Sequence, residues 1–118
     1  MQMSSVRRYA LSLPEATEEA HFAYTSFRVR KKIFVTVPPD AAYVHIFVDD
    51  AERERAIALY PDFAQPLWWG GKVRGLRIQL SDAVPRVVKE LVRKAWERKA
   101  PRNLVTQQTS SRAQRGRG

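Results

Sequence analysis

The sequence contains no cysteine, only two histidines and only five glycines among its 118 residues. The lack of cysteine excludes a disulfide-stapled scaffold, a thiol nucleophile and every thiolate metal site. The glycines Gly70, Gly71 and Gly75 form neither a P-loop nor a G-x-G-x-x-G fingerprint, so the common nucleotide-phosphate loops are missing. We therefore expect no metal and no cofactor.

Long hydrophobic runs are also missing. The most apolar region, Ile33–Val48, is interrupted by two prolines and an aspartate, and is too short and broken to span a bilayer. No apolar signal segment follows the arginines Arg7 and Arg8 near the N-terminus. We therefore expect a cytoplasmic protein that does not enter the membrane.

Acidic residues are fewer than basic ones: the sequence has 12 Asp and Glu and 21 Lys and Arg, which gives a formal net charge of +9. Four arginines and no acid follow residue 101, so five of the nine net charges remain on the preceding part. Such an excess attracts polyanions. The composition predicts one domain over residues 1–105 and a disordered arginine-rich tail over residues 106–118.

The first half of the chain predicts one helix followed by strands. Ser4 or Ser5 is expected to cap a short helix that runs through Ser12 and ends before Pro14. Apolar residues then recur at mostly two-residue spacing across Ala20–Val37, as in strands with one buried face. The expected turns in this region lie at Ala23–Ser26 and Arg30–Lys32.

The middle of the chain predicts a strand and a helix. Ala42–Val48 follows a Pro-Pro-Asp turn, and we expect Tyr43, His45 and Phe47 to share one face of that strand. Asp49 or Asp50 is expected to cap a second helix over Ala51–Tyr60.

The second half predicts one strand and a long helix after an irregular segment. Phe63–Gly75, rich in Gly, Pro and Trp, is expected to be irregular, and Val73–Leu80 to form a strand. Ala83–Lys99, with Ser81 or Asp82 as its cap, carries a clear amphipathic stripe. The predicted fold class is α+β: a two-layer sandwich in which three helices cover one face of an antiparallel sheet of about five strands.

Candidates for catalysis are weak. A metal site built from Glu18, His21 and His45 is conceivable, but no ligand spacing requires it, and each histidine also suits an ordinary strand position. The adjacent acids Glu18–Glu19 and Asp49–Asp50 cannot flank a substrate from one strand, because neighbouring side chains point to opposite faces. We predict no catalytic residue and no enzymatic activity.

Basic residues cluster at two predicted hairpins. A hairpin rich in Arg and Lys can lie along a phosphate backbone. The alternative is that these residues bind nothing and only protect strand edges and keep the domain soluble. The candidate nucleic-acid-binding cations are Arg28, Arg30, Lys31, Lys32, Lys72, Arg74 and Arg77.

Tandem tryptophans precede the second group of cations. Trp68 and Trp69 cannot both face one core from a strand, so at least one is expected near the surface. An exposed indole beside Lys72 and Arg74 suits the stacking of bases. The alternative is that one tryptophan covers the core and the other packs on the long helix.

Three segments resemble the MmcQ/YjbR family. They are Leu11–Glu15 (LSLPE), Phe27–Phe34 (FRVRKKIF) and Ala95–Val105 (AWERKAPRNLV), and the resemblance extends over about Val6–Val105. It implies a compact double-wing or CyaY-like α+β fold whose members are commonly labelled DNA-binding. By motif match it implies a role in binding for Arg28, Arg30, Lys31 and Lys32, and it supplies no catalytic residue.

Two functions follow from these observations. The first is a small non-enzymatic domain that binds nucleic acid, with DNA as the expected partner, through phosphate contacts of the basic hairpins. The alternative is a protein- or peptide-interaction module of secretion-chaperone-like layout, which offers a sheet face or an edge strand to an extended peptide.

Overall fold

The computed structural model describes residues 1–106 of the chain. It confirms the α+β class, with six strands in the sheet where about five were expected. The predicted disordered tail falls almost wholly on residues 107–118, outside the described part. The elements in chain order are α1 (Met3–Ser12), β1 (Ala16–His21), β2 (Tyr24–Val29), β3 (Lys32–Val37), β4 (Tyr43–Ile46), α2 (Asp50–Leu59), β5 (Ala64–Trp69), β6 (Lys72–Gln79), a 3-10 turn (Leu80–Asp82) and α3 (Pro85–Lys99).

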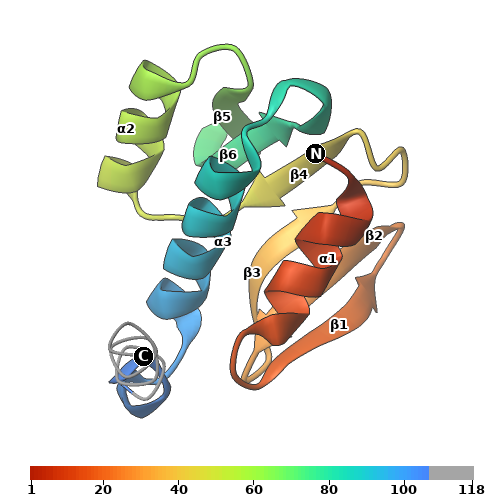
Figure 1. Ribbon diagram of the computed structural model, residues 1–118, viewed down its shortest axis with the longest axis vertical. Coiled ribbons are helices and arrows are strands. Elements are labelled where there is room, and N and C mark those ends of the chain that lie inside the picture. The colour runs from red at the N-terminus through yellow and green to blue at the C-terminus, as the bar shows by residue number, and fades with distance from the viewer. Residues whose placement is uncertain (107–118) are drawn as a thin grey trace, which may run out of the picture.

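The strands form one antiparallel sheet in the order β1-β2-β3-β4-β6-β5, and the helices lie on one face of it. In Figure 1, α1 and α3 cross in front of the sheet, and α2 stands beside α3 near the β5–β6 hairpin. One face of the sheet is therefore covered by helices, and the opposite face, which we call the open face, is free of them within residues 1–106.

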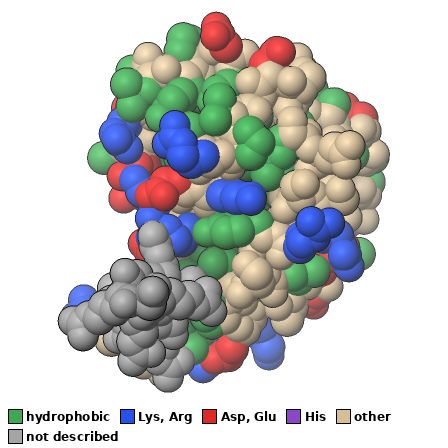
Figure 2. Space-filling view, viewed as in Figure 1, with side chains coloured by type: hydrophobic (Ala, Val, Ile, Leu, Met, Phe, Trp, Pro, Cys, Tyr) green, Lys and Arg blue, Asp and Glu red, His purple; other side chains and the backbone are tan. Residues whose placement is uncertain are grey.

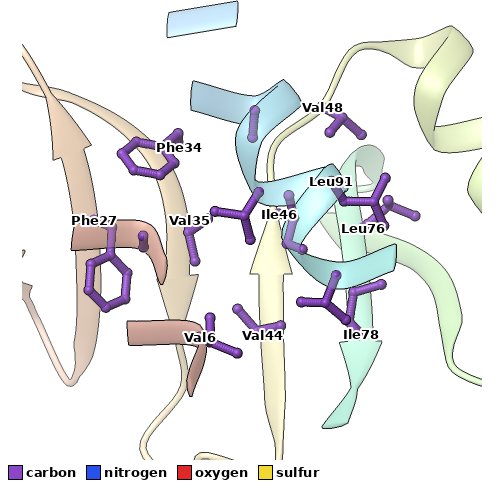
Figure 3. Packing of buried hydrophobic residues seen from close by; sticks show 14 of the residues in the cluster. Val6, Phe27, Phe34, Val35, Val44, Ile46, Val48, Leu76, Ile78 and Leu91 are labelled. Atoms are coloured by element: carbon purple, nitrogen blue, oxygen red, sulfur yellow. The ribbon is translucent and has the colours of Figure 1, made fainter. Parts of the chain in front are cut away.

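The core fills the space between sheet and helices. Val44, Ile46 and Val48 point into it, as the two-residue alternation predicted, and Leu91 of α3 packs above them (Figure 3). Trp96 is fully buried, and its indole N–H donates a hydrogen bond of 3.0 Å to the carbonyl of Pro14. This bond ties the long helix to the corner that follows α1.

The two basic hairpins precede strands that run in the same direction. β3 is antiparallel to β4, and β4 is antiparallel to β6, so β3 and β6 run in the same direction. The turns at Arg30–Lys31 and Gly70–Gly71 therefore lie at the ends where these two strands begin, and the twist of the sheet separates them: the first is at the bottom of Figure 1 and the second behind its upper half. The short strand β4 lies between them in the sheet order, and the chain leaves it toward α2.

Two of the three predicted helix caps are wrong. Gln2, not Ser4 or Ser5, is the N-cap of α1, and no side chain caps it. Ser81 and Asp82 lie in the 3-10 turn, and α3 begins only at Pro85. Proline favours the first position of a helix and forces the residue before it into an extended conformation, which delays the start of α3. The third cap is confirmed, because Asp49 accepts a hydrogen bond of 2.8 Å from the backbone N–H of Glu52.

The expectation of an irregular segment over Phe63–Gly75 is wrong as well. Ala64–Trp69 is strand β5, which pairs with β6 along its whole length. Proline at position 66 suggested a loop, but β5 is the outermost strand, where a missing N–H need not break the ladder. The first expected turn is also displaced, to Phe22–Ala23, with Phe22 in a left-handed conformation.

Candidate nucleic-acid interface

The tip of the β2–β3 hairpin consists of two cationic residues in an unfavourable backbone conformation. Arg30 has a φ of 49° and Lys31 a φ of 71°, the left-handed region in which two-residue hairpin turns normally place glycine or asparagine. Each such residue with a Cβ costs about 1–2 kcal/mol. The hairpin therefore presents Arg and Lys where glycine would fold with less strain.

The four predicted cations of this hairpin divide into two classes. The Arg30 guanidinium donates hydrogen bonds of 2.5 and 2.9 Å to Glu15, and Arg28 lies 3.6 Å from Glu19. Lys31 and Lys32 are exposed, and neither forms an ion pair with any residue of the described chain. Lys31 and Lys32 are thus the cations of this tip that remain available to an anion.

The second hairpin adds two more exposed cations. Lys72 pairs in register with Trp69, and Lys72 and Arg74 form no ion pair within residues 1–106. Here the turn is Gly70–Gly71, whose φ values of 58° and 77° glycine adopts without strain.

The C-terminus of α3 brings further positive charge to the first hairpin. Burial, and then the charges of Arg98 and Lys32, lower the pKa of Lys99 from its ordinary value. Lys32 therefore lies within electrostatic reach of the helix end. We call the six cations at the starts of β3 and β6 and at the end of α3 the basic end; they are Lys31, Lys32, Lys72, Arg74, Arg98 and Lys99.

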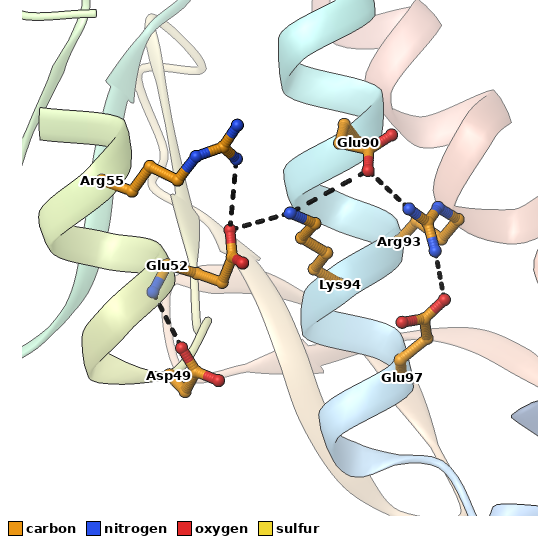
Figure 4. Close-up of polar contacts among 7 residues, drawn as sticks. All are labelled: Asp49, Glu52, Arg55, Glu90, Arg93, Lys94 and Glu97. Carbon is orange, nitrogen blue, oxygen red and sulfur yellow. Dashed lines mark hydrogen bonds and ion pairs between the residues drawn. The ribbon is translucent and has the colours of Figure 1, made fainter. Parts of the chain in front are cut away.

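The basic residues between α2 and α3 are instead neutralised. Lys94 bridges from α3 to Glu52 of α2 at 2.9 Å, and Arg93 pairs with both Glu90 and Glu97 (Figure 4). In Figure 2, which shows the helix-covered face, acidic side chains lie directly beside basic ones at the left, and no continuous basic area forms. The basic end differs in carrying cations that no acid of the described chain pairs with.

Arg77 lies in the middle of β6 on the open face, within the strand that the sequence predicted over Val73–Leu80. Its guanidinium carbon sits 3.8 Å above the ring of Tyr43, and its buried Nε has no hydrogen-bond partner among residues 1–106. His45 pairs in register with Arg77 and lies 3.4 Å from the hydroxyl of Thr36. Burial, and then the charge of Arg77, lower the pKa of His45, while Asp40 acts in the opposite direction.

The tryptophans behave as surface residues. Trp68 is 62% exposed and Trp69 43% exposed, so neither is part of the core. The Trp69 ring stacks on Phe47 with centroids 6.1 Å apart and also approaches Tyr24 at 6.5 Å. The interpretation of Trp68 and Trp69 as core or helix-packing residues is therefore wrong, because the β5–β6 hairpin carries them out of the sandwich.

Metal-ligating clusters and membrane-spanning helices are both absent from the described residues. Within residues 1–106, no group of three His, Asp or Glu side chains could hold a metal ion. No helix of that same part of the chain is both long and apolar enough to cross a bilayer.

The sequence missed several residues that complete these surfaces. Arg98 and Lys99 were interpreted as part of a solvated helix face, because the nearness of Lys99 to Lys32 depends on packing between distant elements. The shared face of Tyr43, His45 and Phe47 was expected, but Tyr24 joins it through the registers of β2 with β3 and of β3 with β4.

The comparisons with known proteins agree with this architecture. The sequence model of the YjbR family matches residues 11–98, which is most of the chain. The chain belongs to the YjbR family. No curated protein matches the chain at a significant level.

A solved structure supports the fold of this YjbR protein. The crystal structure of a Deinococcus radiodurans protein of domain family DUF419 superposes with a TM-score of 0.70. The match covers 80% of this chain and 75% of the other, at 17% sequence identity. At that identity the similarity concerns the fold alone.

Proposed function

We propose that this YjbR protein is a non-enzymatic nucleic-acid-binding domain that contacts phosphates through the basic end. The observation that carries the proposal is that two hairpins, which precede strands running in the same direction, both carry exposed cations without an ion pair in residues 1–106. Phosphate contacts by Lys and Arg supply most of the sequence-independent affinity for nucleic acid. DNA is the expected partner.

The strained turn supports the same function. Residues held in sparsely populated backbone regions concentrate at functional sites, where another requirement outweighs the cost. A glycine pair closes the β5–β6 hairpin, so this fold can accommodate glycine in such a turn. Keeping Lys31, whose ammonium forms no ion pair within residues 1–106, at the other tip is consistent with a need for its charge.

The test compares matched charge removals. Lys31→Gln/Lys32→Gln and Lys72→Gln/Arg74→Gln remove cations of the basic end, and Arg8→Gln/Arg86→Gln removes two exposed cations of the helix layer as a control. Binding to duplex DNA is measured by fluorescence anisotropy at several salt concentrations. Each lost phosphate contact should reduce the slope of log affinity against log salt by about 0.9.

The control should bind as the unmodified protein does. Equal binding by all variants, or no binding at low salt, would refute the proposal. A variant ending at Thr106 separates the described domain from the arginine-rich remainder, since binding that disappears with residues 107–118 would assign the contacts to that segment.

A second candidate function is the binding of an extended peptide along β1. This strand is an outer edge of the sheet, and its four central residues are exposed. Strand addition needs only a free backbone edge. A single protein that co-purifies equally well before and after nuclease treatment would favour this function over nucleic-acid binding.

A further inference from the structure

The open face contains a hollow of about 500 Å³ beneath the β5–β6 hairpin. It joins elements from both halves of the chain: the start of β2, the turn after β3, β4, β5 and β6. The side chains that the argument uses are Tyr24, Asp40, His45, Trp69 and Arg77.

The walls of the hollow are suited to a flat ring. Trp69 stacks on Phe47, which fixes its plane, yet 43% of its surface remains exposed. Tyr24 lies 6.5 Å from Trp69 and 6.0 Å from His45, centroid to centroid. Aromatic side chains arranged this way stack nucleobases irrespective of sequence, because every base has a π face.

The hollow also contains an uncommitted hydrogen-bond donor. The guanidinium of Arg77 lies 3.8 Å above the ring of Tyr43, and its Nε has no acceptor within residues 1–106. A guanidinium donates well to the carbonyl and ring-nitrogen acceptors along a base edge. Asp40 lies at the same hollow; its Oδ1 accepts a hydrogen bond of 3.2 Å from the backbone N–H of Ala42, and its other carboxylate oxygen can accept one from an amino group.

We propose that this hollow receives an unpaired base of a nucleic-acid strand whose phosphates bind the basic end, an inference that rests on the proposed function. Trp69 on β5 and Lys72 on β6 are paired residues of the same hairpin. A base stacked on Trp69 therefore lies next to the strand that carries a phosphate-binding cation. A base inside a duplex is stacked and paired, and it can enter a pocket only after leaving the helix. The protein therefore prefers single strands to duplexes.

The experiment uses three labelled DNA ligands of about 12 nucleotides: a mixed-sequence single strand, its duplex, and a single strand in which abasic sites replace the bases. Their affinities for the full chain are measured by fluorescence anisotropy at one low salt concentration. The mixed-sequence strand should bind more tightly than the abasic strand, by roughly 5-fold to 100-fold for one or more stacked bases.

Trp69→Leu should remove that difference while leaving the affinity for duplex unchanged, and Trp69→Phe should restore part of it. Phe22→Leu is the matched control, because Phe22 is 93% exposed and lies outside the hollow. Arg77→Gln provides a second variant that keeps the stacking residue, and it should weaken binding of the mixed-sequence strand alone. Circular dichroism verifies that each variant is folded.

The outcomes separate the two proposals. Equal affinity for the abasic and mixed-sequence strands, or a base preference that survives Trp69→Leu, would overturn the base-binding hollow and leave the phosphate-binding function standing. No binding of any of the three ligands would overturn the proposed function, and the hollow's role with it.

Discussion

The carboxylate of Glu15 accepts two hydrogen bonds from the guanidinium of Arg30, at 2.5 and 2.9 Å. Glu15 lies in the corner between α1 and β1, and Arg30 at the tip of the β2–β3 hairpin. The hydrogen bonds from Arg30 lower the pKa of Glu15 below its ordinary value. The pair therefore persists at neutral pH and holds one cation of the hairpin away from external anions.

Glu15→Gln should strengthen nucleic-acid binding. The substitution removes a negative charge beside the tip and frees Arg30 to contact a phosphate. One added contact should steepen the salt dependence of log affinity for duplex DNA by about 0.9. Glu54→Gln is the control, since it removes an exposed acid from α2, and it should leave the slope unchanged. An unchanged slope for Glu15→Gln would show that Arg30 faces no phosphate.

Gly75→Ala should destabilise the sheet. A Cβ at this position would lie 2.8 Å from the carbonyl oxygen of Ile46 and 3.1 Å from Cδ1 of Phe47. The first contact is with backbone, so β4 and β6 must separate, and we expect a loss of about 1–3 kcal/mol in the free energy of unfolding. Urea denaturation measures it.

Adding Phe47→Leu tests the cause of that loss. This change relieves only the side-chain contact, so the loss caused by Gly75→Ala should persist in the Phe47→Leu background. Recovery of the stability in the double variant would place the clash at the Phe47 ring instead of the Ile46 carbonyl.

The layer structure could be predicted because it depends on local periodicity. The stripe of α3 and the alternation of Val44, Ile46 and Val48 determine which residues face the core, and all of these are buried. Strand β5 could not be predicted in this way. Its proline disfavours a strand in general, and only its position at the sheet edge, a property of the whole topology, makes that proline tolerable.

The candidate site could be predicted only in part. The sequence identified the cations of both hairpins, but it could not show that Glu15 and Glu19 engage two of them, because those pairs depend on where β1 and its preceding corner lie. The hollow on the open face could not be predicted from the sequence either. Tyr24 and Trp69 meet although three strands separate β2 from β5 in the sheet order, and no sequence spacing encodes that meeting.

Stability should decrease below about pH 6.5, partly through His45. Burial and the charge of Arg77 lower the pKa of His45 in the folded state. Between the two pKa values, His45 is therefore protonated in the unfolded chain but neutral in the folded protein. The free energy of unfolding therefore falls as the pH drops through the unfolded-state pKa, by at most about 1.4 kcal/mol per pH unit for one proton. This loss stops once the pH passes below the folded-state pKa.

His45→Gln removes this titration. Urea denaturation at pH 7 and pH 5 should give a smaller difference for the variant than for the unmodified protein. The same difference in both proteins would assign the pH dependence to other groups.

Lys31→Gly should stabilise the fold and weaken its binding at the same time. Lys31 has a φ of 71°, and glycine adopts this conformation without the Cβ clash, so the free energy of unfolding should rise by about 1 kcal/mol. The substitution also removes an unpaired cation of the basic end, so affinity for nucleic acid and its salt dependence should both fall. Lys31→Gln is the matched control, because it loses the charge but keeps the strain. It should bind as weakly as Lys31→Gly without the gain in stability, whereas full binding by Lys31→Gly would mean that the strained lysine serves no contact with phosphate.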